Sequence, residues 1–140
     1  MKDSLNIAIA GATGYVGLEL IKILLKHPKA KILYLCANKS AGKKIYSFDK
    51  SLTKKKLPII TKITAINWDK INILFTALPN GGAHKIARII PTHVKLIDLS
   101  GDFRLKNHKI YKKWYGLEHK SKDLINKSVY SISEFSKKNL

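Results

Sequence analysis

The sequence is short of several residue types, and each shortage excludes a class of protein. A single cysteine, Cys36, occurs in 140 residues, so the disulfide framework of a small secreted domain is excluded. No apolar run approaches the roughly 20 residues of a membrane-spanning helix, and the amino-terminal residues do not follow a signal-peptide pattern. The sequence therefore predicts a cytoplasmic domain with no membrane partner.

Acidic residues and arginines are also scarce. Nine acids stand against 27 basic residues, which gives a net charge of +18 and raises the question of nucleic-acid binding. Arg88 and Arg104 are the sole arginines, although the guanidinium group is the one suited to two-pronged contacts with phosphate and guanine. The lysines are spread along the whole chain, so we interpret the charge as a solvated surface and predict no nucleic-acid partner.

The pattern of apolar segments indicates an α/β fold. Strands are expected at Leu5–Ala10, Ala30–Cys36, Pro58–Ile63 (an edge strand), Ile71–Ala77, Val94–Leu99 and around Val129–Tyr130. Helices are expected at Tyr15–Lys26, Ala83–Ile90, Asn107–Trp114 and from Glu134 onward, whereas residues 38–57 carry weak structural signals. Short connections predict a doubly wound, mostly parallel sheet. This is a Rossmann domain over residues 1–140, with ligands bound at the carboxyl ends of its strands.

The residues GATGYVG at 11–17 are the most specific local motif. They follow the first expected strand and open the first helix, which is the context of a dinucleotide-binding turn. Gly11 would permit the tight turn, Gly14 would let the backbone approach a pyrophosphate, and Gly17 would let the helix pack closely on the sheet. Backbone N–H groups at the helix start, with the Thr13 hydroxyl, would face the anion. A glycine-rich turn without a ligand is the alternative interpretation.

The end of the second expected strand indicates which dinucleotide binds. NAD-binding domains usually carry an acid there, which accepts hydrogen bonds from the ribose 2′-hydroxyl. Residues 36–44 contain no acid and three lysines, and a 2′-phosphate would be received by Asn38, Lys39 and Ser40. This pattern favours NADP(H). The alternative is that Lys39 is one more surface lysine.

Residues 97–105 alternate between apolar and polar types. In an extended chain this period of two places four polar side chains on one face: Asp98, Ser100, Asp102 and Arg104. That face would look into the ligand crevice, where Arg104 would hold a substrate carboxylate or phosphate. An Asp102–Arg104 pair that pins the loop is an equal alternative.

The later aromatic residues and the single cysteine have structural interpretations. Tyr111, Trp114 and Tyr115 are spaced for a small packed cluster. His119 is expected to satisfy a structural hydrogen bond rather than to donate a proton in catalysis. Cys36 is expected to be a small buried core residue in no activating context. No metal site is predicted.

Five stretches of the chain, taken in order, resemble the N-acetyl-γ-glutamyl-phosphate reductases. They are GATGYVGLELIKILLKHP (11–28), SAGKKI (40–45), ALPNGGAH (77–84), LIDLSGDFRL (96–105) and YKKWYGLEH (111–119), and they are distributed over most of the chain, from residue 11 to residue 119. The glycine motif is shared with other semialdehyde dehydrogenases, whereas DLSGDFRL followed by WYGLEH is far more specific. The resemblance implies the NADP(H)-binding Rossmann part of an arginine-biosynthesis enzyme, a homo-oligomer at full length.

The resemblance also implies a reaction and roles for individual residues. In this family a cysteine thiolate displaces phosphate from N-acetyl-γ-glutamyl phosphate, and hydride from NADPH reduces the resulting thioester to the semialdehyde. The pyrophosphate loop would be Gly11, Thr13, Gly14, Tyr15 and Val16. The segment beside the nicotinamide would be Ala77, Leu78, Pro79 and Gly81. Ser40 matches the region of the adenosine ribose, and Ser100 and Arg104 fall near the substrate.

The chain departs from the family pattern at three places. Asn80 stands where the family usually has histidine, and residues 130–134 (YSISE) replace a Tyr-Gly-Leu-Pro-Glu type segment. The family's nucleophilic cysteine lies in an Asn-Pro-Gly-Cys segment, which these 140 residues do not contain. We therefore expect an N-terminal fragment, without the catalytic and dimerisation domain, that binds cofactor and has no reductase activity alone. The alternatives are a lysine-pathway aminoadipate-type reductase, whose substrate is one methylene longer, and a non-catalytic NADP-binding module.

Overall fold

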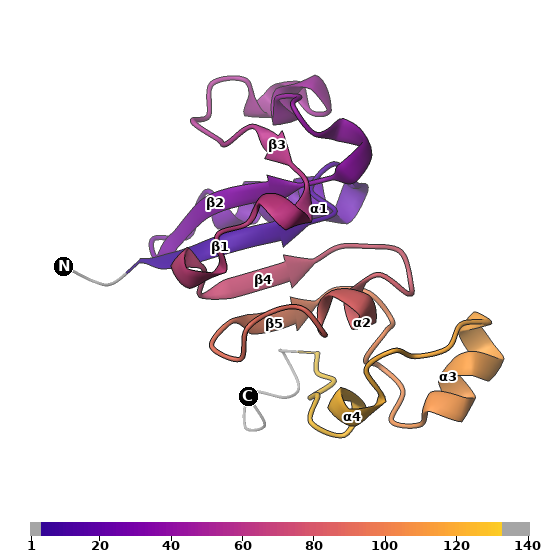
Figure 1. The fold of residues 1–140 in the computed structure, drawn as a ribbon. Helices are drawn as coiled ribbons and strands as arrows, with labels where there is room; N and C mark the ends of the chain where they lie inside the picture. Colours follow the sequence, from indigo (N-terminus) through magenta and orange to yellow (C-terminus); the bar gives the residue numbers. More distant parts are fainter. Residues whose placement is uncertain (1–3, 133–140) are drawn as a thin grey trace. The chain divides into compact units, whose positions relative to one another are not determined.

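The computed structural model describes residues 4–132 (Figure 1). Two compact units divide the chain: unit 1 comprises Met1–Leu78 and Ile90–Leu99, and unit 2 comprises Pro79–Ile89 and Ser100–Leu140. The chain therefore passes from one unit to the other three times, after Leu78, after Ile89 and after Leu99.

Unit 1 is built on a five-stranded sheet. The strands are β1 (Leu5–Ala10), β2 (Ala30–Cys36), β3 (Ile60–Thr61), β4 (Ile73–Thr76) and β5 (Lys95–Asp98). They lie in the order β3-β2-β1-β4-β5, and every pairing is parallel (Figure 1). Because β1 has β2 on one side and β4 on the other, the direction of winding reverses there, and a ligand crevice is expected outside its carboxyl end. The predicted parallel Rossmann sheet is confirmed.

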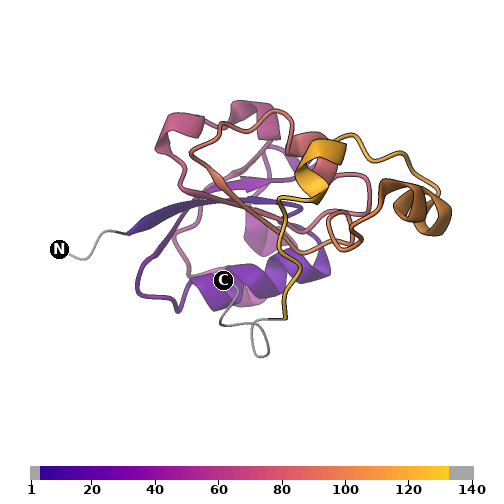
Figure 2. The same ribbon diagram turned by 90° about the horizontal axis from the view of Figure 1, so that it is seen from below.

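Both faces of this sheet are covered within unit 1. Helix α1 (Tyr15–Leu24) lies along one face, and the 3-10 turns at Ile63–Ala65 and Trp68–Lys70 lie on the other (Figure 2). α1 buries Gly17, Ile21 and Leu24, which share one helical face. Between α1 and the strands the core contains Ile7, Ile9, Ile21, Leu24, Leu35 and Ile60. Burial of these aliphatic side chains is the main stabilisation of the unit.

The segment from Asn38 to Leu57, which gave weak signals, contains three 3-10 turns. They span Asn38–Ser40, Ile45–Ser47 and Lys50–Leu52, and the segment is anchored by the buried side chains of Ile45 and Leu52. An ion pair of 2.8 Å from Lys22 Nζ to Asp49 Oδ2 joins the segment to α1. The strand expected at Pro58–Ile63 is reduced to β3 at the sheet edge, since Pro58 has no N–H for a ladder.

The described part of unit 2, up to residue 132, contains three short helices: α2 (Ala83–Ile86), α3 (His108–Tyr115) and α4 (Lys122–Ile125). The Asn107 side chain caps α3 by accepting from the amides of Lys109 and Ile110. Gly116, in the left-handed region at φ 67°, ends that helix.

The interior of unit 2 is mostly polar and aromatic. Among its described residues, these polar and aromatic side chains are fully buried: His84, Asp102, Tyr111, His119 and Ser121. The Tyr111 ring packs on the rings of Tyr115 and His119, with centroids 4.8 and 5.0 Å apart. The packed aromatic cluster predicted from the sequence therefore forms, but Trp114 lies outside it with 75% of its surface exposed.

Three expectations about the second half of the chain differ from the structure or fall outside it, and one helix was not expected. The helix predicted at Ala83–Ile90 is only α2, and α4 was not predicted. Residues Val129–Tyr130, predicted as a strand, are not in a strand. The helix predicted from Glu134 lies outside the described residues.

Candidate functional site

The glycine turn lies where the carboxyl ends of three strands of unit 1 meet. The amides of Gly11 and Ala12 both donate to the carbonyl oxygen of Cys36, at 2.9 and 3.1 Å, which joins the turn to the end of β2. The amide of Ala77 donates to the carbonyl oxygen of Ala10 at 2.8 Å, which joins the end of β4 to that of β1. The turn is thus fixed at the place where this kind of sheet binds its ligand.

The fold itself requires glycine at two positions of the motif. Gly11 has φ +84°, and a Cβ there would stand 2.2 Å from the carbonyl oxygen of Ala77. A Cβ on Gly17 would stand 2.2 Å from the carbonyl oxygen of Gly11, so only a glycine lets α1 approach the turn so closely. These are the steric reasons the sequence suggested for Gly11 and Gly17.

Gly14 is different, because nothing in the described structure requires a glycine there. Its φ of −78° and ψ of 164° are open to any residue, and a Cβ would meet only the carbonyl oxygen of Gly11, at an ordinary 3.5 Å. The missing side chain at Gly14 instead leaves the backbone open to an external group. This is the condition that the approach of a pyrophosphate demands.

The start of α1 has the electrostatics of an anion site. Gly14 is the N-cap residue, no side chain caps the helix, and its first turn holds no acid. The amides at the helix start therefore lack intrahelical acceptors and carry the positive end of the helix dipole. The side chains of Tyr15 and Val16 are 83% and 49% exposed, so they do not fill the space before the helix. The turn and the helix start fit a pyrophosphate.

The residues predicted to meet the adenosine end follow β2 directly. Asn38, Lys39 and Ser40 form a 3-10 turn, in which Asn38 and Lys39 are exposed and Ser40 is buried. The amide of Ser40 donates to the carbonyl oxygen of Ala37 at 3.0 Å, which closes the turn. Lys39 is therefore free to reach a phosphate in solvent, whereas the Ser40 side chain is enclosed by the fold.

Cys36 lies at the end of β2 and is 3% exposed. Its Sγ is 3.8 Å from Thr61 Oγ1, and burial raises the pKa of the thiol, with the contact to Thr61 opposing that shift. A buried thiol with a raised pKa is a poor nucleophile. The prediction that Cys36 is a small core residue agrees with its place in the structure.

The alternating segment after β5 does not stay extended, so the predicted ladder of four polar side chains is wrong. β5 ends at Asp98, which accepts a hydrogen bond of 2.8 Å from the Thr76 hydroxyl of β4. The chain then turns at residues 101–104. A period of two implies one shared face only while the chain remains a strand, and Gly101 and Asp102 leave it.

Within unit 2 the remaining ladder residues take separate environments. Ser100 Oγ accepts from the amide of Asp102 at 3.1 Å. Arg104 is exposed, and its guanidinium carbon lies 5.7 Å from the ring centroid of Tyr130. No Asp102–Arg104 ion pair occurs among the described residues, so that alternative is wrong. The substrate-binding roles of Ser100 and Arg104 stay predictions.

Asp102 is the centre of a network that sequence reasoning missed. The carboxylate is fully buried and accepts three hydrogen bonds, from the Gly81 amide at 2.8 Å, the His84 amide at 3.1 Å and the Tyr111 hydroxyl at 2.7 Å. Beside it, Asn80 Oδ1 accepts from the Gly101 amide at 3.2 Å. The segment after β4 is thereby tied to the turn after β5 by bonds within unit 2.

The two buried histidines of unit 2 are held by the backbone. His119 Nε2 donates to the carbonyl oxygen of Asp102 at 2.8 Å, and its Nδ1 accepts from the Ser121 amide at 3.2 Å. His84 Nδ1 accepts from the Lys120 amide at 3.2 Å, and its Nε2 has no partner among the described residues. His119 therefore has the structural role predicted for it.

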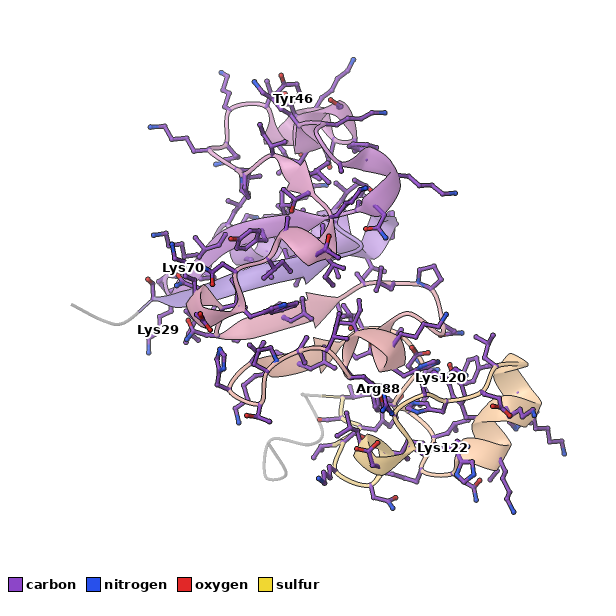
Figure 3. The ribbon with its side chains drawn as sticks, in the orientation of Figure 1. Lys29, Tyr46, Lys70, Arg88, Lys120 and Lys122 are labelled. Atoms are coloured by element: carbon purple, nitrogen blue, oxygen red, sulfur yellow. The ribbon has the colours of Figure 1, made fainter. Side chains whose placement is uncertain are left out.

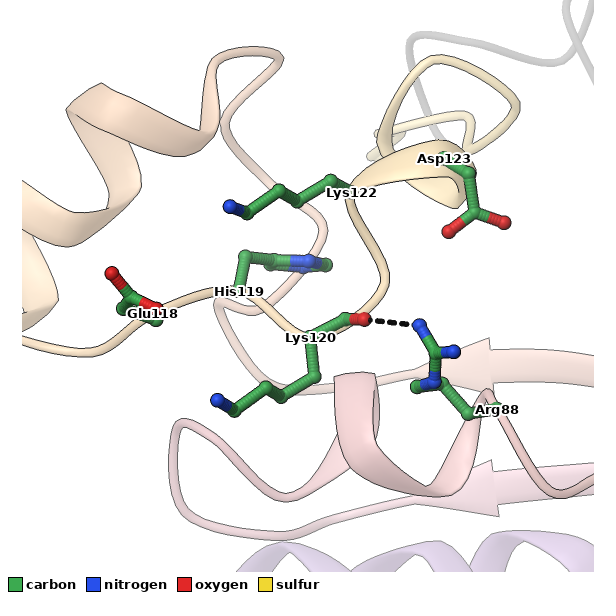
Figure 4. A pocket seen from close by; sticks show the side chains of 6 residues that line it. All are labelled: Arg88, Glu118, His119, Lys120, Lys122 and Asp123. Atoms are coloured by element: carbon green, nitrogen blue, oxygen red, sulfur yellow. Dashed lines mark hydrogen bonds between the residues drawn. The ribbon is translucent and has the colours of Figure 1, made fainter.

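A cavity of about 440 Å³ lies in unit 2, and none of the predicted site residues lines it. It is lined by Arg88, Glu118, His119, Lys120, Lys122 and Asp123 (Figure 4). Arg88 Nη1 donates to the carbonyl oxygen of Lys120 at 2.7 Å, so part of the guanidinium is used structurally. Both acidic and basic side chains line this cavity, and Lys120 and Lys122 are exposed, so it selects for no single charge.

Residues 4–132 were searched for a membrane-spanning helix and for a metal-binding group. No helix in that range is long and apolar enough to cross a membrane. In the same range no three metal-ligating side chains gather into a group that would hold an ion.

Relatives of the chain were found by sequence and by structure. A reductase of Ehrlichia canis, named N-acetyl-gamma-glutamyl-phosphate reductase, is 43% identical over 135 residues, which cover 96% of this chain and 39% of that protein. The protein of the same name from Paracoccus denitrificans is 39% identical over 132 residues, 94% of this chain and 39% of that one. The chain thus spans about two fifths of the relatives it matches.

Among solved structures the likeness establishes the fold. Aspartate semialdehyde dehydrogenase II of Vibrio cholerae superposes with a TM-score of 0.60 at 23% identity, over 74% of this chain and 30% of that one. An NADP complex of the aspartate semialdehyde dehydrogenase of Candida albicans gives 0.55 at 23% identity, over 76% and 32%. Residues 6–140 match the family described as semialdehyde dehydrogenase, NAD binding domain. With that match over nearly the whole chain, and the glycine turn placed at the reversal point of a parallel sheet, this protein belongs to the semialdehyde dehydrogenase family.

Proposed function

We propose that this chain is the NADP(H)-binding part of an N-acetyl-γ-glutamyl-phosphate reductase. The observation that carries the proposal is the uncapped start of α1 behind Gly14, where the backbone is open although the fold does not need a glycine. The names of the relatives supply the reaction, the reduction of an acyl phosphate to a semialdehyde. Bound NADPH would supply the hydride for this reduction.

Different residues of unit 1 would contact different parts of the cofactor. The amides at the start of α1, with Thr13 and Gly14, would bind the pyrophosphate. Lys39 and Asn38 would meet the 2′-phosphate, with Ser40 shaping their turn. Ala77 and Leu78 would lie beside the cofactor as the chain leaves β4. That residues 1–140 form one cofactor-binding domain, in a cytoplasmic homo-oligomer, is part of the same proposal.

In unit 2 we assign Pro79 and Gly81 to the nicotinamide side and Ser100 and Arg104 to the substrate. Gly81 has φ +92°, which presents its peptide groups in a direction that other residues rarely adopt. The exposed guanidinium of Arg104 suits a two-pronged contact with the carboxylate or phosphate of N-acetyl-γ-glutamyl phosphate. None of these four residues carries a thiol, so the thiolate of the reaction has to come from a residue other than those assigned.

The chain is expected to bind NADPH in preference to NADH. No acid stands between residues 36 and 44 to repel a 2′-phosphate, and Lys39 is exposed in the turn after β2. Charge-assisted contacts of this kind favour NADPH by about tenfold or more. Titration of both cofactors by fluorescence at two salt concentrations measures the preference, and Lys39→Glu should weaken NADPH binding while affecting NADH far less.

A charge change at the opposite edge of the sheet provides the control. Lys29 and Lys70 are exposed and lie at that opposite edge, where β2 and β4 begin (Figure 3). Lys29→Glu and Lys70→Glu alter the net charge as much as Lys39→Glu does, so both should keep NADPH affinity within about twofold. Equal losses in all three proteins, or equal affinity of the parent for NADPH and NADH, would contradict a 2′-phosphate contact at Lys39.

Cys36 is expected to have no part in cofactor binding or in catalysis. Its thiol is buried with a raised pKa, so reaction with iodoacetamide at pH 7.5 should be slow, and Cys36→Ser should bind NADPH as the parent does. The 140-residue chain should show no phosphate-dependent reduction of NADP⁺ with N-acetylglutamate semialdehyde. Turnover that disappears in the Cys36→Ser protein would mean that the reacting thiol has been misplaced.

A further inference from the structure

The cavity in unit 2 is lined in part by a stretch of chain that its neighbours hold in place. The ring of His119, one of its lining residues, is 1% exposed and is bonded to the backbone at both nitrogens. The Lys120 amide donates to His84 Nδ1 at 3.2 Å, and the Lys120 carbonyl oxygen accepts from Arg88 Nη1 at 2.7 Å. This part of the lining is therefore preformed, as it is in most small-molecule sites, and the volume of about 440 Å³ lies in their range.

On one side of the cavity a base and an acid face each other without forming an ion pair. Figure 4 shows the guanidinium of Arg88 and the carboxylate of Asp123 turned toward one another, and neither belongs to an ion pair among the described residues. The bond to the Lys120 carbonyl oxygen uses only part of the guanidinium, which has further N–H donors. A ligand with a carboxylate and an ammonium group on one carbon would satisfy both charges. A free α-amino acid carries this pair of groups, whereas inside a peptide both are converted to amides.

The other side of the cavity is positively charged. The ammonium groups of Lys120 and Lys122 extend there, toward Glu118 (Figure 4). Glu118 already pairs with Lys112 at 3.0 Å, and this hydrogen bond, with the nearby charges of Lys122 and Lys120, lowers the pKa of the Glu118 carboxyl group. Because Lys112 offsets the one acid on this side, two lysine charges remain for a ligand. They favour a second carboxylate, on the side chain of the amino acid.

We propose that this cavity binds a free α-amino acid with an acidic side chain. Arg88 takes the α-carboxylate, Asp123 takes the α-ammonium group, and the side-chain carboxylate lies between Lys120 and Lys122. The site lies wholly within unit 2 and does not depend on the cofactor proposed for unit 1. N-acetyl-γ-glutamyl phosphate lacks the required charges, because its nitrogen is acylated and neutral.

L-Glutamate is the probe for this site. Glutarate and N-acetyl-L-glutamate are matched comparators, since both keep two carboxylates and lack the ammonium group. In ¹⁵N spectra L-glutamate should shift the amide signals of Lys120 and Asp123 with a Kd of about 1 mM or below, and both comparators should bind about tenfold more weakly. Comparators that bind as tightly as L-glutamate would overturn the proposal, as would signals that do not move with any of the three at about 20 mM.

Asp123→Asn tests the ammonium contact directly. The change keeps the size of the side chain and removes its charge, so L-glutamate should bind about tenfold more weakly. Glutarate has no ammonium group and should not lose affinity. Asp123 is exposed, so unit 2 should fold as in the parent, and the comparison of the three ligands on the parent does not depend on any variant.

Glu118→Gln is the matched control, because it removes the same charge from the same cavity without touching the ammonium contact. L-Glutamate should bind this variant as tightly as the parent or more tightly, since an acid beside Lys120 and Lys122 has been neutralised. Equal losses of L-glutamate affinity in Asp123→Asn and Glu118→Gln would overturn the proposal. Equal losses for L-glutamate and glutarate in Asp123→Asn would overturn it as well.

Discussion

The Gly14→Ala protein is expected to fold as the parent does and to bind NADPH about a hundredfold more weakly. The backbone of Gly14 is in a region open to alanine, and the new Cβ has 3.5 Å to its nearest described neighbour. Stability should therefore change by less than about 1 kcal/mol. The methyl group would stand in the path of the pyrophosphate and prevent two charge-assisted bonds. Gly14→Val should bind below detection.

Gly17→Ala is the counterpart of this experiment. It adds the same methyl group at a position where the new group meets the protein's own backbone. A Cβ at Gly17 would stand 2.2 Å from a backbone oxygen and 3.0 Å from backbone carbons of Ala12, so the helix would have to move. We expect a loss of about 3 kcal/mol of stability. Thermal unfolding followed by circular dichroism measures stability, and isothermal titration measures affinity. Normal NADPH affinity in Gly14→Val would exclude this turn as the cofactor site.

Unit 2 is expected to lose stability below about pH 6.5, whereas unit 1 should not change in the same way. Burial lowers the pKa of His84 and of His119 from the usual 6.5, while the charge of Asp102 opposes the shift at both. The unfolded state therefore binds more protons than the folded state once the pH falls below 6.5. The stabilisation is complete above that pH and is lost as the pH falls toward the lowered pKa values.

The hydrogen bonds explain why charging these rings is unfavourable. Each Nδ1 accepts from a backbone amide, so a proton there replaces an attraction with a contact between two donors. The two rings are also only 4.7 Å apart, and a charge on one disfavours a charge on the other. Each histidine should lower the free energy of unfolding of unit 2 by up to about 1.4 kcal/mol for each pH unit below 6.5.

Near-ultraviolet circular dichroism of the buried tyrosines and hydrogen exchange of the Gly81 and His84 amides report on unit 2 between pH 7.5 and 5. His84→Asn provides the control, since its side-chain oxygen can accept from the Lys120 amide without titrating. This variant should show a flatter pH dependence than the parent. Identical stability of unit 2 at pH 5 and pH 7.5 in the parent would show that the histidines do not limit it.

Unit 1 was largely predictable because its signals are local or periodic. The buried runs at Leu5–Ala10 and Ala30–Cys36 became strands with the predicted bounds, and the glycine spacing marked the turn and the start of α1. β3 is shorter than its apolar run, since an edge strand gains little from its free side. The short connections between strands and helices also predicted the parallel, doubly wound sheet, whereas the order of its strands came from the structure.

Unit 2 was predicted poorly because long-range bonds determine it. The bonds from Asp102 to His84 and from Ser121 to His84 join residues 18 and 37 positions apart, and no periodicity reports such pairs. Asp102 looked like part of an alternating strand because Gly101, which ends the extended region, also fits the alternation. A buried acid and two buried histidines cannot be told from exposed ones by composition. The α2 and α4 helices have four residues each, too short to give a periodic signal.

The three passages of the chain between the units impose an order on events during synthesis. Residues 79–89 of unit 2 leave the ribosome before Ile90–Leu99, the last part of unit 1. The hydrogen bond from the His84 amide to Asp102 can form only later, because Asp102 is made 18 residues after His84. At the roughly 5–20 residues per second of translation, the delay is about 1–4 seconds. Until then the His84 amide forms its hydrogen bond with water, so residues 79–84 can take their final path only after Asp102 has been made.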